Sequence, residues 1–107
     1  MDKLLNYLGL AMRSGNLVSG DGAVLKAIRC GQAMAVVLAR DAANNAKKKF
    51  ADKCAFYRVP LIEYGSREQL GRSIGKHERV VLAVTDQGLA RMIIQCWETS
   101  TGVKWSE

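Results

Sequence analysis

The chain has 107 residues, of which 49% are hydrophobic and 24% are charged, values that suit one globular domain and exclude a long disordered tail. Its 16 Lys and Arg outnumber 10 Asp and Glu, and residues 21–60 hold eight basic but only three acidic side chains. Basic charge gathered in the middle of a chain favours a polyanionic partner, because each phosphate contact releases condensed counterions. A soluble domain with a high isoelectric point and no such partner is the alternative at this stage.

The cysteines and the apolar segments indicate the compartment. Cys30, Cys54 and Cys96 are odd in number and form no Cys-x-x-Cys pair, which predicts neither a disulfide framework nor a zinc site. Asn6 and Arg13 interrupt the apolar N-terminal stretch, and no run approaches the ~20 apolar residues of a membrane helix. We therefore expect a cytoplasmic protein that has no membrane-spanning helix and binds no metal or cofactor.

The first 40 residues predict a helix, a short strand, a second helix and a longer strand. Apolar side chains recur at helical spacing over residues 2–13, and Asp2 can cap that helix. A strand at residues 17–18 leads into a helix over residues 21–30, which its first residue can cap. Residues 33–39 are continuously apolar, which is typical of a strand buried on both faces.

The second half of the chain continues the alternation of helices and strands. Ser66 and Gln69 form a Ser-x-x-Gln capping box, so a helix starts there, and Gly75 ends it. The remaining predicted elements are a helix over residues 41–54, a strand over 60–63, a fully apolar strand over 80–84 and a helix over 86–98.

This order predicts a three-layer α/β/α sandwich around about four strands. Residues 1–98 are expected to form the single domain, and residues 99–107, with Trp105, a C-terminal tail.

A glycine-rich turn lies between the first predicted strand and the second helix. Ser19-Gly20-Asp21-Gly22 would expose backbone N–H groups at the positive end of a helix, which suits phosphate, and Lys26 follows one turn later. A plain helix start with a solvated lysine fits the same spacing.

The same turn imitates part of a dinucleotide-binding fingerprint. Gly20 and Gly22 are spaced correctly, and Asp41 follows at the distance of the acidic residue that holds a ribose. Leu25, however, replaces the third glycine, and the preceding strand is very short. A small nucleotide-binding domain therefore remains an alternative.

A second basic segment surrounds the end of the Ser66 helix. Arginine side chains there could contact phosphate oxygens or lie flat on bases, although helix C-termini favour cations in any case. The residues concerned are Arg67, Arg72, Gly75, Lys76, His77 and Arg79. The run at residues 47–49 is expected to be a solvated helix face.

Catalysis has little support in the sequence. His77 is the single histidine, and no serine or cysteine nucleophile is predictable beside it. A non-enzymatic protein is expected, and a protein-interaction module with a basic face is a further alternative.

Several stretches match, in order and spacing, the YlxQ proteins. These are a bacterial branch of the ribosomal-protein superfamily that includes kink-turn RNA binders, and the resemblance covers about residues 4–95. The similar stretches are Leu4–Gly20, in which Leu8–Gly15 is the clearest part, Lys26–Arg29, Leu38–Asn44, Lys53-Cys54 with Val59-Pro60, and Gln69–Gly75.

The resemblance implies an α/β/α sandwich with a mixed sheet and a non-catalytic protein that binds ribosomal or other structured RNA, with the ribosome as an expected partner. It implies that RNA is held by the loop and helix start after the first strand and by the loop before the last strand. The residues predicted to contact RNA are Arg13, Gly20, Asp21, Gly22, Lys26, Arg29, Arg40, Asn44, Arg67, Arg72, Gly75, Lys76, His77 and Arg79.

One departure affects specificity. The kink-turn binders that the chain resembles carry an Asn-Glu pair in the first loop, which reads paired G·A bases by hydrogen bonds. Gly22-Ala23 stands there in this sequence and cannot make those contacts. Phosphate positioning is therefore expected without kink-turn base readout.

Overall fold

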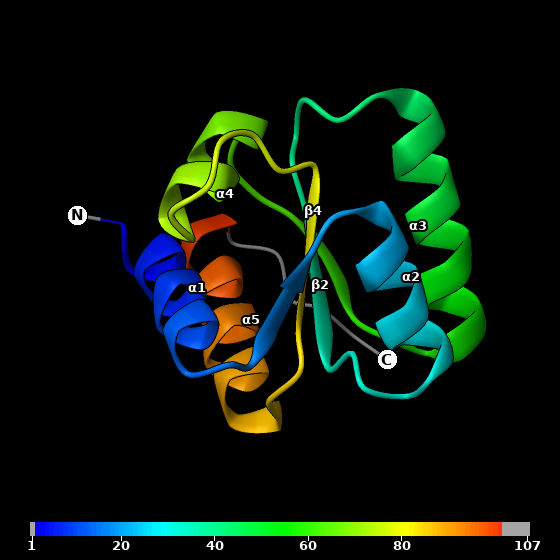
Figure 1. Ribbon diagram of the computed structural model, residues 1–107, viewed down its shortest axis with the longest axis horizontal. Coiled ribbons are helices and arrows are strands. Elements are labelled where there is room, and N and C mark those ends of the chain that lie inside the picture. The colour runs from blue at the N-terminus through cyan, green and yellow to red at the C-terminus, as the bar shows by residue number, and fades with distance from the viewer. Residues whose placement is uncertain (1, 102–107) are drawn as a thin grey trace.

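The computed structural model describes residues 2–101, which form the predicted three-layer α/β/α sandwich (Figure 1). A mixed sheet lies between two layers of helices, as the resemblance implied. The elements are α1 (Lys3–Arg13), β1 (Leu17–Ser19), α2 (Asp21–Arg29), β2 (Ala35–Leu38), α3 (Asn44–Tyr57), β3 (Leu61–Glu63), α4 (Arg67–Ser73), β4 (Val81–Val84) and α5 (Gln87–Thr101).

The sheet has the order β1-β4-β2-β3. The strand β4 pairs antiparallel with both β1 and β2, whereas β2 and β3 run parallel. Every residue of β2 and β4 is buried, which confirms the prediction that these apolar runs are covered on both faces.

The two faces of the sheet bury separate cores. Along β4, Leu82 and Val84 pack with α1, α4 and α5, whereas Val81 and Ala83 pack with α2 and α3. This alternation follows from the two-residue period of side chains along a strand. Figure 1 shows the corresponding division, with α1, α4 and α5 on one side and α2 and α3 on the other.

Two predicted helix caps are present, and one is wrong. Asp2 accepts a 3.0 Å hydrogen bond from the Leu5 N–H, and the capping box of Ser66 and Gln69 is complete. The start of α2, however, has Gly20 as its N-cap, while Asp21 is the first helical residue. Its carboxylate binds Lys49 instead, so it caps nothing within its own helix.

Two helices also differ from their predicted bounds: α3 covers Asn44–Tyr57 instead of residues 41–54, and α5 covers Gln87–Thr101 instead of residues 86–98. The helix α3 begins at Asn44 rather than at Asp41, because residues 40 and 41 are tied to the segment before α4: the Arg40 N–H donates to the Gly65 carbonyl. The helix α5 continues to Thr101, past the predicted end at residue 98, since residues 99–101 contain neither glycine nor proline. Trp105 lies outside the described residues. No helix within residues 2–101 is long and apolar enough to span a membrane.

Candidate nucleic-acid interface

The strand directions bring four loops to one edge of the sheet. Because β4 is antiparallel to β1 and β2, Ser19 pairs with Leu82 and Leu38 pairs with Val81. The C-terminal ends of β1, β2 and β3 therefore lie beside the N-terminal end of β4. We call the surface formed by residues 19–22, 39–43, 64–67 and 77–80 the loop rim; it occupies the upper part of Figure 1.

Hydrogen bonds hold the two predicted loops side by side. The Gly20 N–H donates to the Val81 carbonyl at 3.2 Å, and Arg79 Nε donates to Ser19 Oγ at 3.3 Å. The Arg79 N–H in turn donates to the Arg67 carbonyl at 3.0 Å. The turn after β1, the start of α4 and the loop before β4 thus form one continuous surface.

The N-terminus of α2 opens onto this surface without a side-chain cap. Gly20 has φ 93°, a conformation that L side chains rarely adopt, and its lack of a side chain makes this tight entry into the helix possible. Within the described residues, the N–H groups of Asp21, Gly22 and Ala23 have no acceptor. A Cβ built on Gly22 would meet nothing within 4 Å. The positive end of the helix is therefore open to an anion.

The acidic groups at the rim are all engaged by cations. Asp21 pairs with Lys49 at 2.9 Å. Arg67 lies 3.6 Å from Asp41 and 4.0 Å from Glu78, so one guanidinium serves two carboxylates. These pairs are at least partly exposed and contribute little to stability, but they reduce the negative potential that phosphate would meet.

Two arginines at the rim are left for a ligand. Arg40 lies over the ring of Tyr64, with its guanidinium carbon 5.5 Å from the ring centroid. Within the described residues, the Arg79 side chain donates only to uncharged oxygens, namely the Ser19 hydroxyl and the backbone carbonyl of Glu78. No ion pair in residues 2–101 includes either guanidinium. A cation held in place without a protein anion is suited to phosphate.

Some predicted residues extend the rim and others lie away from it. Lys26 is exposed about one turn further along α2, and Asn44 is exposed at the first position of α3. Arg29 is the last residue of α2, about 12 Å along the helix from Asp21 and so at the end of α2 opposite the rim. Arg13 and Arg72 flank a groove between α1 and α4 instead.

The loop before β4 reaches the rim through its second half. Gly75, with φ 75°, ends α4 together with Lys76, at the opposite end of that helix from Ser66. From there His77 and Glu78 pass back across α4 to Arg79. Gly75 and Lys76 therefore lie beside the rim rather than in it.

Three residues that shape the rim, of which only Ser19 lies within it, were not predicted as site residues. Ser19 and Lys49 orient Arg79 and Asp21, but their partners are distant in sequence. Gly71 lies where residues 77–78 cross α4: a Cβ there would stand 1.2 Å from the His77 carbonyl oxygen. A glycine inside a predicted helix is a signal for such a close approach.

The enzymatic and nucleotide-binding alternatives find no support in this geometry. The strand β4 separates β1 from β2, so Gly20 and Asp41 do not follow adjacent parallel strands. Asp41 also already accepts the Arg67 N–H at 2.9 Å. Cys54 is a buried residue of α3, whereas His77 is exposed on the other side of the sheet, so they form no catalytic pair.

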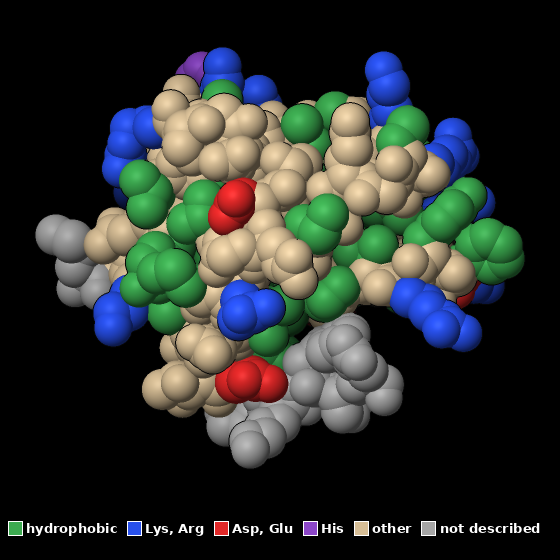
Figure 2. Space-filling model, turned by 90° about the horizontal axis from the view of Figure 1, so that it is seen from below, with side chains coloured by type: hydrophobic (Ala, Val, Ile, Leu, Met, Phe, Trp, Pro, Cys, Tyr) green, Lys and Arg blue, Asp and Glu red, His purple; other side chains and the backbone are tan. Residues whose placement is uncertain are grey.

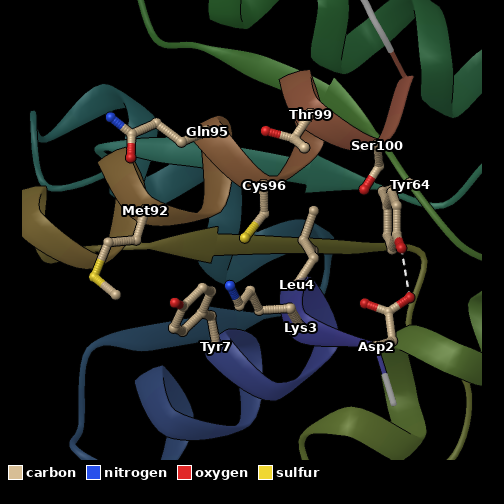
Figure 3. Close-up of a pocket in the computed structure, with 10 residues that line it drawn as sticks. All are labelled: Asp2, Lys3, Leu4, Tyr7, Tyr64, Met92, Gln95, Cys96, Thr99 and Ser100. Atoms are coloured by element: carbon tan, nitrogen blue, oxygen red, sulfur yellow. Dashed lines mark hydrogen bonds between the residues drawn. The ribbon is translucent and has the colours of Figure 1, made fainter.

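A hollow of about 580 Å³, separate from the loop rim, lies between α1 and α5 (Figure 3). At its edge the Tyr64 hydroxyl donates a hydrogen bond to Asp2, and this bond, with burial, raises the pKa of Tyr64 to about 12. Lys3 is the one cation, and Asp2 the one carboxylate, among the described lining residues. This hollow is therefore less suited to phosphate than the rim.

The end of the molecule opposite the loop rim exposes both basic and acidic side chains (Figure 2). Figure 2 shows Lys and Arg side chains mainly along its outline, with acidic side chains nearer the middle. The loops that gather at the rim belong to the other end of the sheet (Figure 1).

Comparison with known proteins places this architecture in a class: small α/β/α proteins related to those of the ribosome. A family model described as the ribosomal protein L7Ae/L30e/S12e/Gadd45 family matches residues 2–94. The chain belongs to this family, as its resemblance to one branch predicted.

Individual relatives agree with that assignment. The RNA-binding protein YlxQ of Bacillus subtilis is 53% identical over 87 residues, covering 81% of this chain and 87% of the relative. The large ribosomal subunit protein eL30 of Aeropyrum pernix is 32% identical, covering 81% and 89%. A solved Bacillus halodurans protein of unknown function superposes with a TM-score of 0.87 at 45% identity, covering 90% and 97%. A Giardia lamblia 15.5kD RNA binding protein shares the fold, with a TM-score of 0.75 at 22% identity over 90% and 82%.

Proposed function

We propose that this protein binds structured RNA, without catalysing a reaction, and that the loop rim is its primary contact surface. The observation that carries the proposal is the N-terminus of α2, which has no side-chain cap, beside the guanidinium of Arg79, which forms no ion pair within residues 2–101. Family membership and the names of the YlxQ and eL30 relatives support RNA as the ligand.

The rim offers two kinds of phosphate donor. The N–H groups at the start of α2 point toward a ligand along the helix dipole, while Arg40 and Arg79 supply full charges. Lys26 and Asn44 extend the surface on either side. Contacts of this kind fix the position of a nucleic acid but do not read its sequence.

The start of α2 offers no side chain that could read bases by hydrogen bonds. Gly22 and Ala23 are exposed at the start of α2 but carry no hydrogen-bonding side chain. The proposed ligand is therefore ribosomal or other structured RNA, recognised by its shape and phosphates. The proposed site of action is the ribosome, and the proposed compartment is the cytoplasm. The three free cysteines are compatible with a reducing compartment.

The test uses fragmented bacterial ribosomal RNA as the probe. The Lys26→Ala/Arg79→Ala variant removes two rim charges and should weaken binding about tenfold at moderate salt. It should also reduce the slope of log K against log salt by about one to two, because each phosphate contact contributes about 0.7–0.9.

The matched control is Arg29→Ala/Arg91→Ala, which removes two exposed charges away from the rim. It should keep most of the affinity and of the salt slope. Equal binding by the parent and the rim variant at both low and moderate salt would exclude the proposed surface.

A further inference from the structure

A second basic surface lies outside the loop rim, in the groove where α1 packs on α4. The groove has a volume of about 300 Å³ and is lined by residues of both helices, among them Asn6, Gly9, Arg13, Gln69, Arg72 and Ser73. Two arginines and no carboxylate line it among the described residues. It occupies the left side of Figure 1, where α4 lies above α1.

Gly9 explains how the groove forms. A Cβ at this position would lie 2.8 Å from the Ser73 carbonyl oxygen and 3.3 Å from Arg13 Nη1. The missing side chain lets the two helices approach closely and lets the Arg13 guanidinium lie back along α1. A glycine inside a helix costs about 0.5–1 kcal/mol relative to alanine, so its presence here has a packing reason.

The two guanidinium groups approach the groove from different helices. Arg13 takes part in no ion pair within residues 2–101. Arg72 pairs with Glu68, which lies one turn earlier on α4 and does not line the groove. Both side chains are exposed, so a phosphate entering the groove would meet two forked donors, of which Arg72 is shared with Glu68.

The groove is continuous with the loop before β4. Arg72 also lines a neighbouring hollow of about 300 Å³, together with Lys76, His77 and the two glutamates Glu68 and Glu78. Both carboxylates are paired with arginines, Glu68 with Arg72 and Glu78 with Arg67. From His77 the chain passes over Gly71 and reaches Arg79 at the rim. The basic side chains of Arg79, Lys76 and Arg72 therefore follow one path from the rim, along the loop, into the groove, with the paired carboxylates of Glu68 and Glu78 beside it.

We propose that the α1–α4 groove is a second RNA-contact site, which binds the phosphates of a strand leaving the loop rim. Arg13 and Arg72 contact phosphate in the groove, and Lys76 and His77 contact the segment between the two sites. This inference rests on the proposed function, because it takes the ligand to be RNA. It adds that the bound RNA extends beyond the rim and around α4.

The experiment compares two RNAs with groove and rim variants of the full chain. The first RNA is a ribosomal RNA fragment retained by the parent protein, and the second is the same fragment trimmed to the shortest length that still binds. Arg13→Ala/Arg72→Ala should weaken binding of the long RNA about threefold to tenfold and lower its salt slope by about one to two, but leave the short RNA unaffected.

Two further variants separate contact from packing. Arg13→Lys/Arg72→Lys keeps both charges and should preserve the salt slope. Glu68→Gln removes the carboxylate that competes for Arg72 and should strengthen binding of the long RNA by about twofold to threefold, which a purely structural role for Arg72 would not produce. Circular dichroism melting curves of all variants verify folding.

The outcomes distinguish this site from the rim. One outcome is that Lys26→Ala/Arg79→Ala binds the long RNA more weakly while the groove variant binds it as the parent does. This outcome overturns the groove as an RNA site and supports the rim. Unchanged binding in both variants excludes the rim and the groove alike, whereas a parent protein that retains no ribosomal RNA fragment removes the proposed function itself. A groove variant that loses a protein partner in ribonuclease-treated extracts, but no RNA affinity, assigns the groove to a protein and also overturns this inference.

Discussion

Arg79 Nε donates a 3.3 Å hydrogen bond to Oγ of Ser19, which lies 60 positions earlier in the chain. This contact joins the turn that starts α2 to the loop that enters β4, the two loops at the centre of the rim. The bond fixes the direction of a guanidinium that has no carboxylate partner within residues 2–101. The orientation of Arg79 therefore depends on a hydroxyl from another element.

Ser19→Ala should weaken RNA binding by a few-fold without changing its salt dependence. The charge of Arg79 remains, so the number of counterions released is the same, but the guanidinium is no longer held in one direction. Binding isotherms at three or more salt concentrations measure both quantities. Arg79→Ala is the comparison, since it should lower the affinity further and also reduce the slope; equal slopes for the two variants would contradict this reading.

Gly71→Ala should destabilise the fold and disturb the rim together. The new Cβ would stand 1.2 Å from the His77 carbonyl oxygen and 3.0 Å from the Glu78 Cα, so the loop must move away from α4. Overpacking of this kind costs about 1–3 kcal/mol of unfolding free energy. Urea denaturation measures the loss, and RNA binding should weaken because Arg79 follows the displaced segment.

The same substitution at Gly22 is the matched control for Gly71. Gly22 lies in α2, and a Cβ there meets nothing within 4 Å. Gly22→Ala should be neutral or stabilise the helix by up to about 1 kcal/mol, because alanine is the better helix former. A loss at Gly22 as large as at Gly71 would show that the cost comes from helix position rather than from the crossing loop.

Gly22→Asn/Ala23→Glu should confer a preference for kink-turn RNA. Both positions are exposed at the start of α2 with room for side chains, and this pair reads G·A bases in the kink-turn binders that the chain resembles. A good base contact contributes about 1–3 kcal/mol of discrimination, so a preference of at least about fivefold is expected. Competition between a kink-turn RNA and a version with its G·A pairs replaced measures it.

The Gly22→Ala single variant controls for the altered helix start, since it adds a Cβ without a hydrogen-bonding group. It should discriminate between the two RNAs no better than the parent. Failure of the double variant to discriminate would mean that the bound RNA does not place bases against this turn.

Cys54 should be the slowest of the three thiols to react. Burial raises the pKa of Cys54 to about 11, whereas Cys30 is exposed. Because the folded-state pKa is raised, this thiol favours the folded state fully below about pH 9, and that contribution is lost as the pH rises through about 11. A Cys30→Ser/Cys96→Ser variant isolates Cys54 for alkylation.

Alkylation of that variant should be slow in the native state and fast in denaturant at the same pH. Between pH 9 and 11 the native rate should rise steeply as the thiolate forms. Fast native labelling at pH 8 would contradict the buried position of Cys54 in α3.

Local pattern was sufficient for the elements and for part of the site. The continuous apolar runs around Val36 and Val81 correctly predicted fully buried strands, and Ser66 with Gln69 correctly predicted the start of α4. These features depend on residues within a few positions of each other. The cap of α2 and the start of α3 were wrong because Asp21 and Asp41 bind Lys49 and Arg67, which lie 28 and 26 positions away.

The sequence by itself determined the alternation of helices and buried strands, the glycine turn at Gly20, the concentration of basic residues and the family resemblance. All of these are local in the chain or additive along it. Only the tertiary structure decided which charges share a surface, because that depends on strand order. With β4 between β1 and β2, Arg79 lies against Ser19, whereas Arg13 and Arg72 lie apart in the α1–α4 groove. Sequence periodicity does not predict such neighbours, because they arise only when β4 pairs between β1 and β2.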